Sequence, residues 1–216
     1  MERLICLLIG YIFGLFQTSY IIGKTMGVDI RSKGSGNAGT TNALRTFGLK
    51  IGLLTLLGDI CKCILAVVIT WLLFRSAYPD MGPLLKVWTA AGVIIGHDFP
   101  FYMNFKGGKG IAAMAGMIIA FGDLRLLALG IVLFFGIFFT THYVSLGSLT
   151  AISGFFLGAI IAGQMGLYSM PQNYLTEMYA VLFVLVAIAY YGHRGNIVRL
   201  AQGNERKTYL TKKNKQ

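Results

Sequence analysis

The sequence contains few charged residues, and few of those are acids. Only 12% of its 216 residues are charged, whereas about a quarter of the residues in soluble proteins are. Eight acids stand against nineteen lysines and arginines, and 56% of the residues are hydrophobic. This balance excludes an ordinary soluble domain. The basic residues are scattered between apolar runs that hold the aromatic residues, so the net charge of +11 does not indicate a nucleic-acid partner.

Cysteine is also scarce, and its placement excludes two kinds of cysteine site. The three cysteines, Cys6, Cys61 and Cys63, all lie within apolar runs. An odd number of cysteines in apolar surroundings argues against a disulfide framework. The spacing of Cys61 and Cys63 does not match that of zinc ligands. We therefore expect neither a metal ion nor a cofactor.

Apolar runs take up most of the chain. They cover residues 4–23, 51–74, 84–96, 111–121, 126–141, 149–167 and 178–192. The first run is longer than the core of a signal peptide and has no small-residue cleavage site, so we expect an uncleaved span. The third and fourth runs are short for a full crossing. The sequence predicts one all-α integral membrane domain over residues 1–216, a compact bundle of about seven transmembrane helices. Five full spans with a re-entrant pair are the alternative.

Lysine and arginine are distributed unevenly between the two sides that seven crossings would create. Fourteen of the nineteen lie in loops 24–50 and 104–110 and in the tail from residue 193, all on one side. Four lie on the other side, and Lys62 lies within the second apolar run. The positive-inside rule therefore places the N-terminus outside and the C-terminus in the cytoplasm. The polar, basic tail 202–216 is predicted to be flexible and to lie on anionic lipid headgroups.

A first glycine-rich segment covers residues 31–45. Gly34, Gly36 and Gly39 match the dinucleotide-binding pattern, but that pattern requires a preceding strand, and here it lies between two membrane helices. Glycines still let backbone amides approach an anion, hydroxyls and side-chain amides add donors, and arginine forks onto phosphate oxygens. A flexible polar linker is the alternative. We predict a phosphate site formed by Ser35, Gly36, Asn37, Thr41, Asn42 and Arg45.

A second glycine-rich segment covers residues 96–110. A Walker A loop would need glycine at position 103 and serine or threonine at position 110, so Met103 and Gly110 exclude it. The segment nevertheless leads into an apolar helix, where free amides and two lysines suit phosphate. A membrane anchor of positive charge would explain the lysines but would not need the glycines. The predicted phosphate-binding residues here are His97, Lys106, Gly107, Gly108, Lys109 and Gly110.

Two further groups of polar residues are candidates for function. His193 and Asn196 lie three apart after the last apolar run, so on a continuing helix they share a face. A histidine at a helix end is more often a capping group than a catalyst. Asp59 and Lys62 also lie three apart, inside the second run, where ionisable residues are often functional. A mutual ion pair that lets both be buried is the favoured interpretation.

Together these segments resemble the PlsY family, the acyl-phosphate:glycerol-3-phosphate acyltransferases of the bacterial inner membrane. The matching stretches are 34–45, 96–100 with 105–110, and 193–196 through 203–205, in order along nearly the whole chain. The resemblance implies a seven-helix, multi-pass enzyme whose active site faces the cytoplasm. The chain departs from the usual family residues at Tyr20, Cys63, His142 and Gly195. None of these departures touches the glycines predicted to bind phosphate.

The resemblance implies transfer of a fatty acyl group from acyl phosphate to the 1-hydroxyl of glycerol 3-phosphate. The products are lysophosphatidate and inorganic phosphate, and the reaction is the first acylation of phospholipid biosynthesis. An acyl phosphate is already activated, so the enzyme needs alignment and charge stabilisation more than a covalent nucleophile. By similarity, Ser35 and Arg45 would meet glycerol 3-phosphate, and Lys109 would complete the phosphate cradle. The catalytic pair His193 and Asn196 would orient the hydroxyl, with the proton going to His193 or to the departing phosphate.

Two other functional classes would also place positive charge near a membrane. A transporter of an anionic metabolite usually shows an internal repeat and binding groups at mid-membrane, whereas this sequence shows no repeat and its basic motifs cluster at one face. A non-catalytic scaffold anchored by basic loops would leave the glycines unexplained. We therefore expect an acyltransferase that works as a monomer among membrane lipids, with acyl phosphate and glycerol 3-phosphate as its partners.

Overall fold

The computed structural model describes residues 1–209, which contain ten α-helices and no strand. Short 3-10 helices cover Ile30–Ser32, Pro79–Met81 and Phe101–Met103. The α-helices are α1 (Glu2–Gly14), α2 (Thr18–Thr25), α3 (Thr40–Phe47), α4 (Leu49–Phe74), α5 (Gly82–Asp98), α6 (Ile111–Phe121), α7 (Leu124–Thr141), α8 (Val144–Gln164), α9 (Gln172–Gly192) and α10 (Arg194–Ala201). The all-helical prediction is confirmed.

Five stretches of the described chain are long and apolar enough to cross a membrane. They are α1 with α2, α4, α7, α8 and α9. The third and fourth predicted runs correspond to α5, with 17 residues, and α6, with 11. At 1.5 Å per residue, α6 is about 16 Å long, roughly half the thickness of a hydrocarbon core. It cannot cross a membrane alone.

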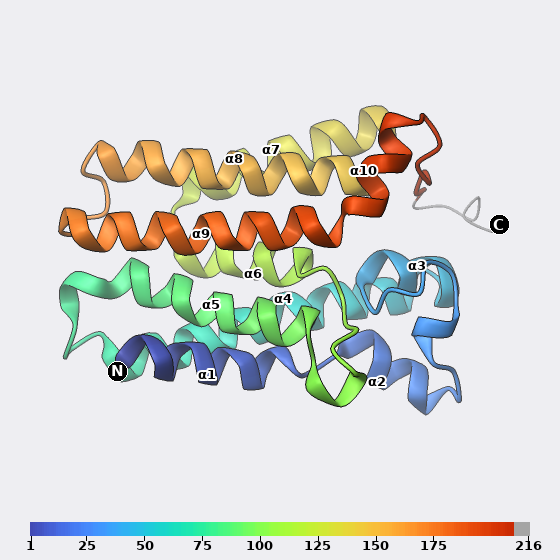
Figure 1. The fold of residues 1–216 in the computed structure, drawn as a ribbon, viewed down its shortest axis with the longest axis horizontal. Helices are drawn as coiled ribbons and strands as arrows, with labels where there is room; N and C mark the ends of the chain where they lie inside the picture. Colours follow the sequence, from blue (N-terminus) through green and yellow to red (C-terminus); the bar gives the residue numbers. More distant parts are fainter. Residues whose placement is uncertain (210–216) are drawn as a thin grey trace.

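The predicted basic loops meet at one end of the bundle, called here the basic end. Figure 1 shows α2, α3 and α10 at this end, and the N-terminus and the α4–α5 and α8–α9 connections at the other. Contacts between distant segments hold the basic end together. The amide of Ala38 donates to the carbonyl of Gly107 over 3.4 Å, and that of Thr208 donates to His142 over 2.9 Å. The loops predicted to share a side are therefore adjacent.

The first predicted span is two helices rather than one. Residues 15–17 separate α1 from α2, and the break leaves backbone carbonyls without helical partners. Tyr102 donates its hydroxyl to the carbonyl of Leu15 over 2.6 Å, and Lys62 donates to that of Phe16 over 2.8 Å. A break inside an apolar bundle is tolerated only when such donors replace the lost bonds. Because these two donors come from remote parts of the chain, the length of the apolar run did not indicate the break.

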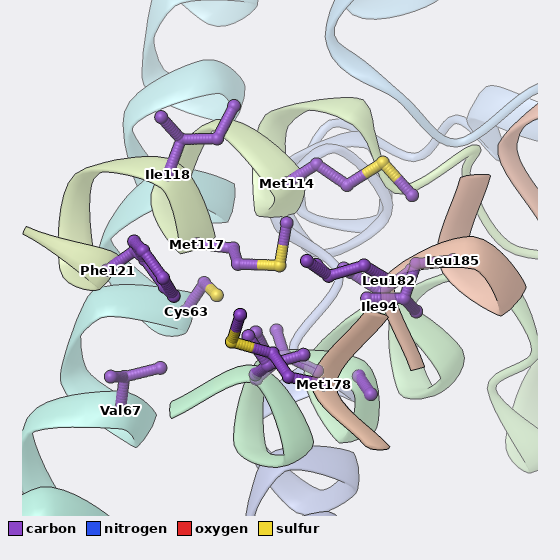
Figure 2. Close-up of a cluster of buried hydrophobic side chains, with 14 of the residues drawn as sticks. Cys63, Val67, Ile94, Met114, Met117, Ile118, Phe121, Met178, Leu182 and Leu185 are labelled. Carbon is purple, nitrogen blue, oxygen red and sulfur yellow. The ribbon is translucent and has the colours of Figure 1, made fainter. Parts of the chain in front are cut away.

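Helix α6 lies in the middle of the molecule, between α7, α8 and α9 on one side and α1, α4 and α5 on the other (Figure 1). Figure 2 shows its side chains meeting residues of α4, α5 and α9. The buried cluster includes Cys63, Val67, Ile94, Met114, Met117, Ile118, Phe121, Met178, Leu182 and Leu185. Six of its eleven residues are buried, although Ile119 is 41% exposed. The short α6 is therefore largely a core element.

Glycines bring α1 and α5 into close backbone contact. A Cβ atom added to Gly92 would lie 2.1 Å from the carbonyl oxygen of Leu7. One added to Gly10 would lie 2.1 Å from the carbonyl oxygen of Thr89. Small residues four apart on both helices allow this approach, as in many membrane helix pairs. The position of α5, which carries part of the site at its end, depends on this contact.

We expect Gly92→Ala to destabilise the protein. The added methyl would overpack the α1–α5 contact, which costs about 1–3 kcal/mol in well-packed cores. The melting temperature in detergent should fall. Gly136→Ala is the control, since a Cβ at Gly136 on α7 meets nothing within 4 Å and alanine favours helix. Equal melting temperatures for the two variants would contradict the packing argument.

Candidate active site

A cavity of about 280 Å³ opens at the basic end. Its polar lining residues are Asn37, Asp98, Lys106, Lys109 and Arg194, and its apolar or aromatic ones are Phe99, Phe105, Ile188 and Tyr191. Gly107 and Gly108 lie between the lysines on the same loop. Residues from the first and second predicted segments therefore share one cavity with residues that flank His193. An anion with an apolar tail would match this mixed lining.

The glycine loop, residues 106–110, is attached to the end of α5. The amide of Gly107 donates to the carbonyl of Asp98, and that of Gly108 to the carbonyl of His97, each over 3.0 Å. These two amides are therefore not free to bind an anion. The sequence suggested that they were, and the structure corrects that reason for the glycines. A Cβ at Gly107 would lie 2.0 Å from the carbonyl oxygen of His97, and Gly110 adopts a φ of +70°. The glycines let the loop approach α5 and turn into α6.

Asn42 organises the first segment from inside. It is 2% exposed, and its Oδ1 accepts a hydrogen bond from the amide of Ser35 over 2.8 Å. Its Nδ2 donates to the carbonyls of Asn37, Lys33 and Ile30 over 2.9, 3.0 and 3.1 Å. Both polar atoms of Asn42 are thus used within the segment. The structure places this predicted phosphate ligand beneath the loop instead of on the cavity wall.

The other predicted residues of the first segment lie at different depths. Asn37 lines the cavity, and its Nδ2 donates to the carbonyl of Gly107 over 3.5 Å. Ser35 and Gly36 are exposed, and Thr41 is half-buried in α3. None of these last three contributes to the cavity wall. The first segment therefore reaches the cavity through Asn37.

Arg45 is held by residues near the end of the described chain. Its Nη2 donates to Thr208 Oγ1 over 2.6 Å and to the carbonyl of Arg206 over 3.2 Å. Burial, then the charge of Arg206, lowers the pKa of Arg45, although a guanidinium stays charged at physiological pH. Thr208 is buried, so part of the tail predicted to be flexible is packed. Residues 210–216 of that tail lie outside the described residues.

Glu205 holds Asn196, the second residue of the predicted catalytic pair, which in turn contacts the glycine loop. Its Oε1 accepts hydrogen bonds from Asn196 over 2.6 Å and Ser145 over 3.0 Å, and its Oε2 accepts one from Arg199 over 2.7 Å. Burial opposes ionisation of Glu205, but these hydrogen bonds outweigh it and lower the pKa. Asn196 Oδ1 in turn accepts a hydrogen bond from Lys109. The predicted catalytic Asn196 is thus fixed at both ends of its amide.

His193 ends α9 beside the cavity, between the lining residues Gly192 and Arg194. It is 4% exposed, and its Nδ1 lies 2.8 Å from the carbonyl oxygen of Ala189, which can only accept. Nδ1 therefore carries the proton, and Nε2 is the acceptor of the neutral ring. Burial, then the charge of Lys109, lowers the pKa of His193 to about 4. The ring is neutral at physiological pH.

Several cavity residues were not predicted as site residues. Ile188 and Tyr191 were indistinguishable in sequence from apolar residues that fill a span or face lipid, and Phe105 and Asp98 lie within the second glycine-rich segment but were not singled out. Asp98 is 6% exposed and lines the cavity, and its Oδ1 has no hydrogen-bond partner in the described part of the chain. Across residues 1–209, no three histidine, cysteine, aspartate or glutamate side chains form a group that could hold a metal ion.

His97 lies behind the glycine loop and is not among the residues that line the cavity. It is buried at the end of α5, and a Cβ added to Gly108 would lie 2.0 Å from its Nε2. Its Nδ1 lies 2.8 Å from Lys62 Nζ. This predicted phosphate ligand therefore supports the loop from below.

Comparison with known proteins gives a consistent match. A family model described as glycerol-3-phosphate acyltransferase matches residues 4–203. The chain is 38% identical to the glycerol-3-phosphate acyltransferase of Alkaliphilus metalliredigens (strain QYMF), with 96% of each chain covered. It is also 38% identical to the one from Clostridioides difficile (strain 630), with 94% of each covered.

Solved structures agree with the sequence relatives. The chain is similar to PlsY (YgiH), an integral membrane glycerol 3-phosphate acyltransferase, in its glycerol 3-phosphate form. The TM-score is 0.81 and the identity 31%, over 97% of this chain and 96% of that one. The lysophosphatidic acid form of PlsY gives a TM-score of 0.78 at 30% identity, over 97% of each chain.

The charge of Lys109 should control anion binding above neutral pH. Burial lowers its pKa to about 8, against the opposing effect of Glu205. Lys109 is therefore charged below pH 8 and neutral above it. Since sulfate stays a dianion throughout, its affinity should fall about tenfold between pH 7 and pH 9, which thermal shift in detergent would measure.

Lys109→Arg should keep its sulfate affinity at pH 9, because arginine remains charged. Lys106→Arg is the matched control, since Lys106 is the exposed lysine of the same loop. This variant should lose sulfate affinity between pH 7 and pH 9 as the wild type does. An equal loss in the Lys109→Arg variant would rule out Lys109 as the group responsible.

Proposed function

This chain belongs to the glycerol-3-phosphate acyltransferase family, and we propose that the cavity at its basic end is where acyl phosphate acylates glycerol 3-phosphate. The enzyme transfers a fatty acyl group to the 1-hydroxyl, giving lysophosphatidate and inorganic phosphate. The observation that carries the proposal is the meeting of three remote segments at this cavity. Asn37, Lys109 and the residues around His193 all reach it. Both substrates carry phosphate, and the polar lining residues offer them lysine, arginine and amide donors.

The mixed lining of the cavity suits the two halves of an acyl phosphate. Lys106, Lys109 and Arg194 would face its phosphate, and the apolar lining residues would receive the start of the acyl chain. Phe105 and Tyr191 are each 61% exposed, so their rings extend beyond the cavity. In an integral membrane protein such rings lie well in the interface between headgroups and acyl chains. We infer that the chain of the substrate passes between them into the bilayer.

Arg45 would bind the phosphate of glycerol 3-phosphate at the mouth of the cavity. Its contacts to the C-terminal segment both use Nη2. A guanidinium has five N–H donors, so the rest of the fork can reach a phosphate oxygen. Ser35 is exposed on the neighbouring loop and would add a hydroxyl. Asn42 would act indirectly, by holding that loop in shape.

His193 would orient the attacking hydroxyl through its unprotonated Nε2. A pKa of about 4 makes the ring a poor proton acceptor, whereas a phosphate monoester has a second pKa of about 6. The hydroxyl oxygen would attack the acyl carbon, the bond from that carbon to the phosphate oxygen would break, and the proton would pass to the departing phosphate. Lys109, positioned by Asn196, would stabilise the negative charge on that phosphate.

We also propose that the chain crosses the inner membrane of a bacterium with its basic end in the cytoplasm. The five long stretches would cross it, and α5 and α6 would complete a seven-segment bundle. Of the sixteen lysines and arginines in residues 1–209, eleven belong to the basic end, which the positive-inside rule favours. All the groups assigned above come from one chain, so the enzyme would work as a monomer surrounded by lipid.

Purified protein should release phosphate from acyl phosphate only when glycerol 3-phosphate is present, and lysophosphatidate should accumulate in equal amount. Arg45→Ala should raise the KM for glycerol 3-phosphate about 10- to 100-fold, since a charge-assisted hydrogen bond contributes about 1.5–3 kcal/mol. Lys50→Ala is the control, because Lys50 is an exposed base at the same end that does not line the cavity. No phosphate release from the wild type would refute the function. An unchanged KM in Arg45→Ala would refute this role of Arg45.

His193→Ala should lower kcat about tenfold at saturating substrate, the cost of losing an orienting hydrogen bond. A loss of about 10³-fold or more would instead indicate that His193 takes the proton, as a general base would. His142→Ala serves as the control. His142 is a half-buried histidine at the same end, outside the cavity wall, and its variant should keep the wild-type kcat. Wild-type kcat in His193→Ala would remove the histidine from the mechanism.

A further inference from the structure

A buried ammonium group lies next to the break in the first span. Lys62 is 4% exposed, and its Nζ donates to Asp59 Oδ1 and to the carbonyl of Phe16, each over 2.8 Å. The predicted ion pair with Asp59 is therefore confirmed. The third neighbour at 2.8 Å is Nδ1 of His97. Three N–H groups thus have three close acceptors, and the ammonium is saturated.

This contact fixes which nitrogen of His97 carries the proton. A charged lysine only donates, so His97 Nδ1 must accept the hydrogen bond. The proton of the neutral ring is then on Nε2. A proton on Nδ1 would face the ammonium of Lys62 directly.

His97 in turn supports the glycine loop from below. Its Nε2 would lie 2.0 Å from a Cβ atom at Gly108, so ring and loop are in direct contact. Its carbonyl accepts hydrogen bonds from the amide of Gly108 over 3.0 Å and from Gln17 Nε2 over 2.9 Å. Gly108 lines the cavity, and Lys109 is the next residue. The ring and the carbonyl of His97 therefore fix the distance between the glycine loop and the end of α5.

We propose that Lys62 is a positioning residue for acyl transfer: it holds His97 as the Nε2–H tautomer against Gly108 and so places the glycine loop for phosphate. An ion pair needed only to bury two charges would require Asp59 and no contact with His97. The hydrogen bond to His97 instead connects the break in the first span to the wall of the cavity. The kinetic part of this inference rests on the proposed function. The assignment of the His97 tautomer does not depend on the proposed function.

The first experiment measures the tautomer in the wild-type protein. Histidine labelled with ¹⁵N distinguishes the two neutral tautomers and the doubly protonated ring by chemical shift. The His97 signals are assigned as those missing from His97→Gln. We expect the Nε2–H tautomer at pH 7. An Nδ1–H tautomer or a doubly protonated ring would overturn the proposal, even if every Lys62 variant failed to fold.

The second experiment compares two variants that both break the ion pair. Lys62→Met keeps the side-chain length but loses every donor, whereas Asp59→Asn leaves Lys62 able to donate to His97. Lys62→Met should raise the KM for at least one phosphate-bearing substrate about tenfold, equivalent to one hydrogen bond, with kcat within about threefold of wild type. It should also give a mixture of His97 tautomers.

Asp59→Asn should lower the melting temperature but keep the wild-type KM values and tautomer. Equal rises in KM for both variants would mean that the pair acts only through stability, and unchanged KM values in Lys62→Met would likewise overturn the proposal. Wild-type turnover is measured beside them. A wild type that is inactive but has the Nε2–H tautomer would refute the proposed function and leave the Lys62–His97 arrangement standing.

Discussion

Backbone carbonyls left unpaired inside an apolar bundle are the constraint on which the basic end is built. The first span breaks at residues 15–17, and α5 ends at Asp98 in the same region. Within the bundle no water can serve every exposed carbonyl, so donors must come from the protein. Lys62 serves the break, and the amides of Gly107 and Gly108 serve the end of α5. Each donor that meets this need also positions a part of the cavity.

The helices could be predicted from the sequence because their signal is local. Apolar runs of the right length marked every long helix, and even the short α6 matched its predicted run, residues 111–121. The gathering of the basic loops at one end also followed from counting lysines and arginines. These features depend on composition over about twenty residues, which a sequence shows directly.

The reasons for individual residues were harder to predict, because they depend on contacts between remote segments. Gly107 and Gly108 were predicted to bind phosphate and do line the cavity, but the structure explains them by the close approach of α5. Asn42 was expected to face a phosphate, yet its polar atoms hold its own loop together. A pattern of glycines and donors looks the same whether it binds an anion or a neighbouring backbone. Only the folded structure distinguishes these two roles.

The packed segment around Glu205 and Thr208 has a consequence for how the enzyme is made. Glu205 contacts Ser145 and Asn196, and Thr208 contacts Arg45, so this late segment joins parts of the site that are synthesised much earlier. A ribosome delivers the chain from its N-terminus, and every membrane helix precedes these residues. A nascent chain could therefore have all its spans inserted while Arg45 and Asn196 still lack their final partners. The contacts around Glu205 and Thr208 would form after the spans are inserted, as a separate event.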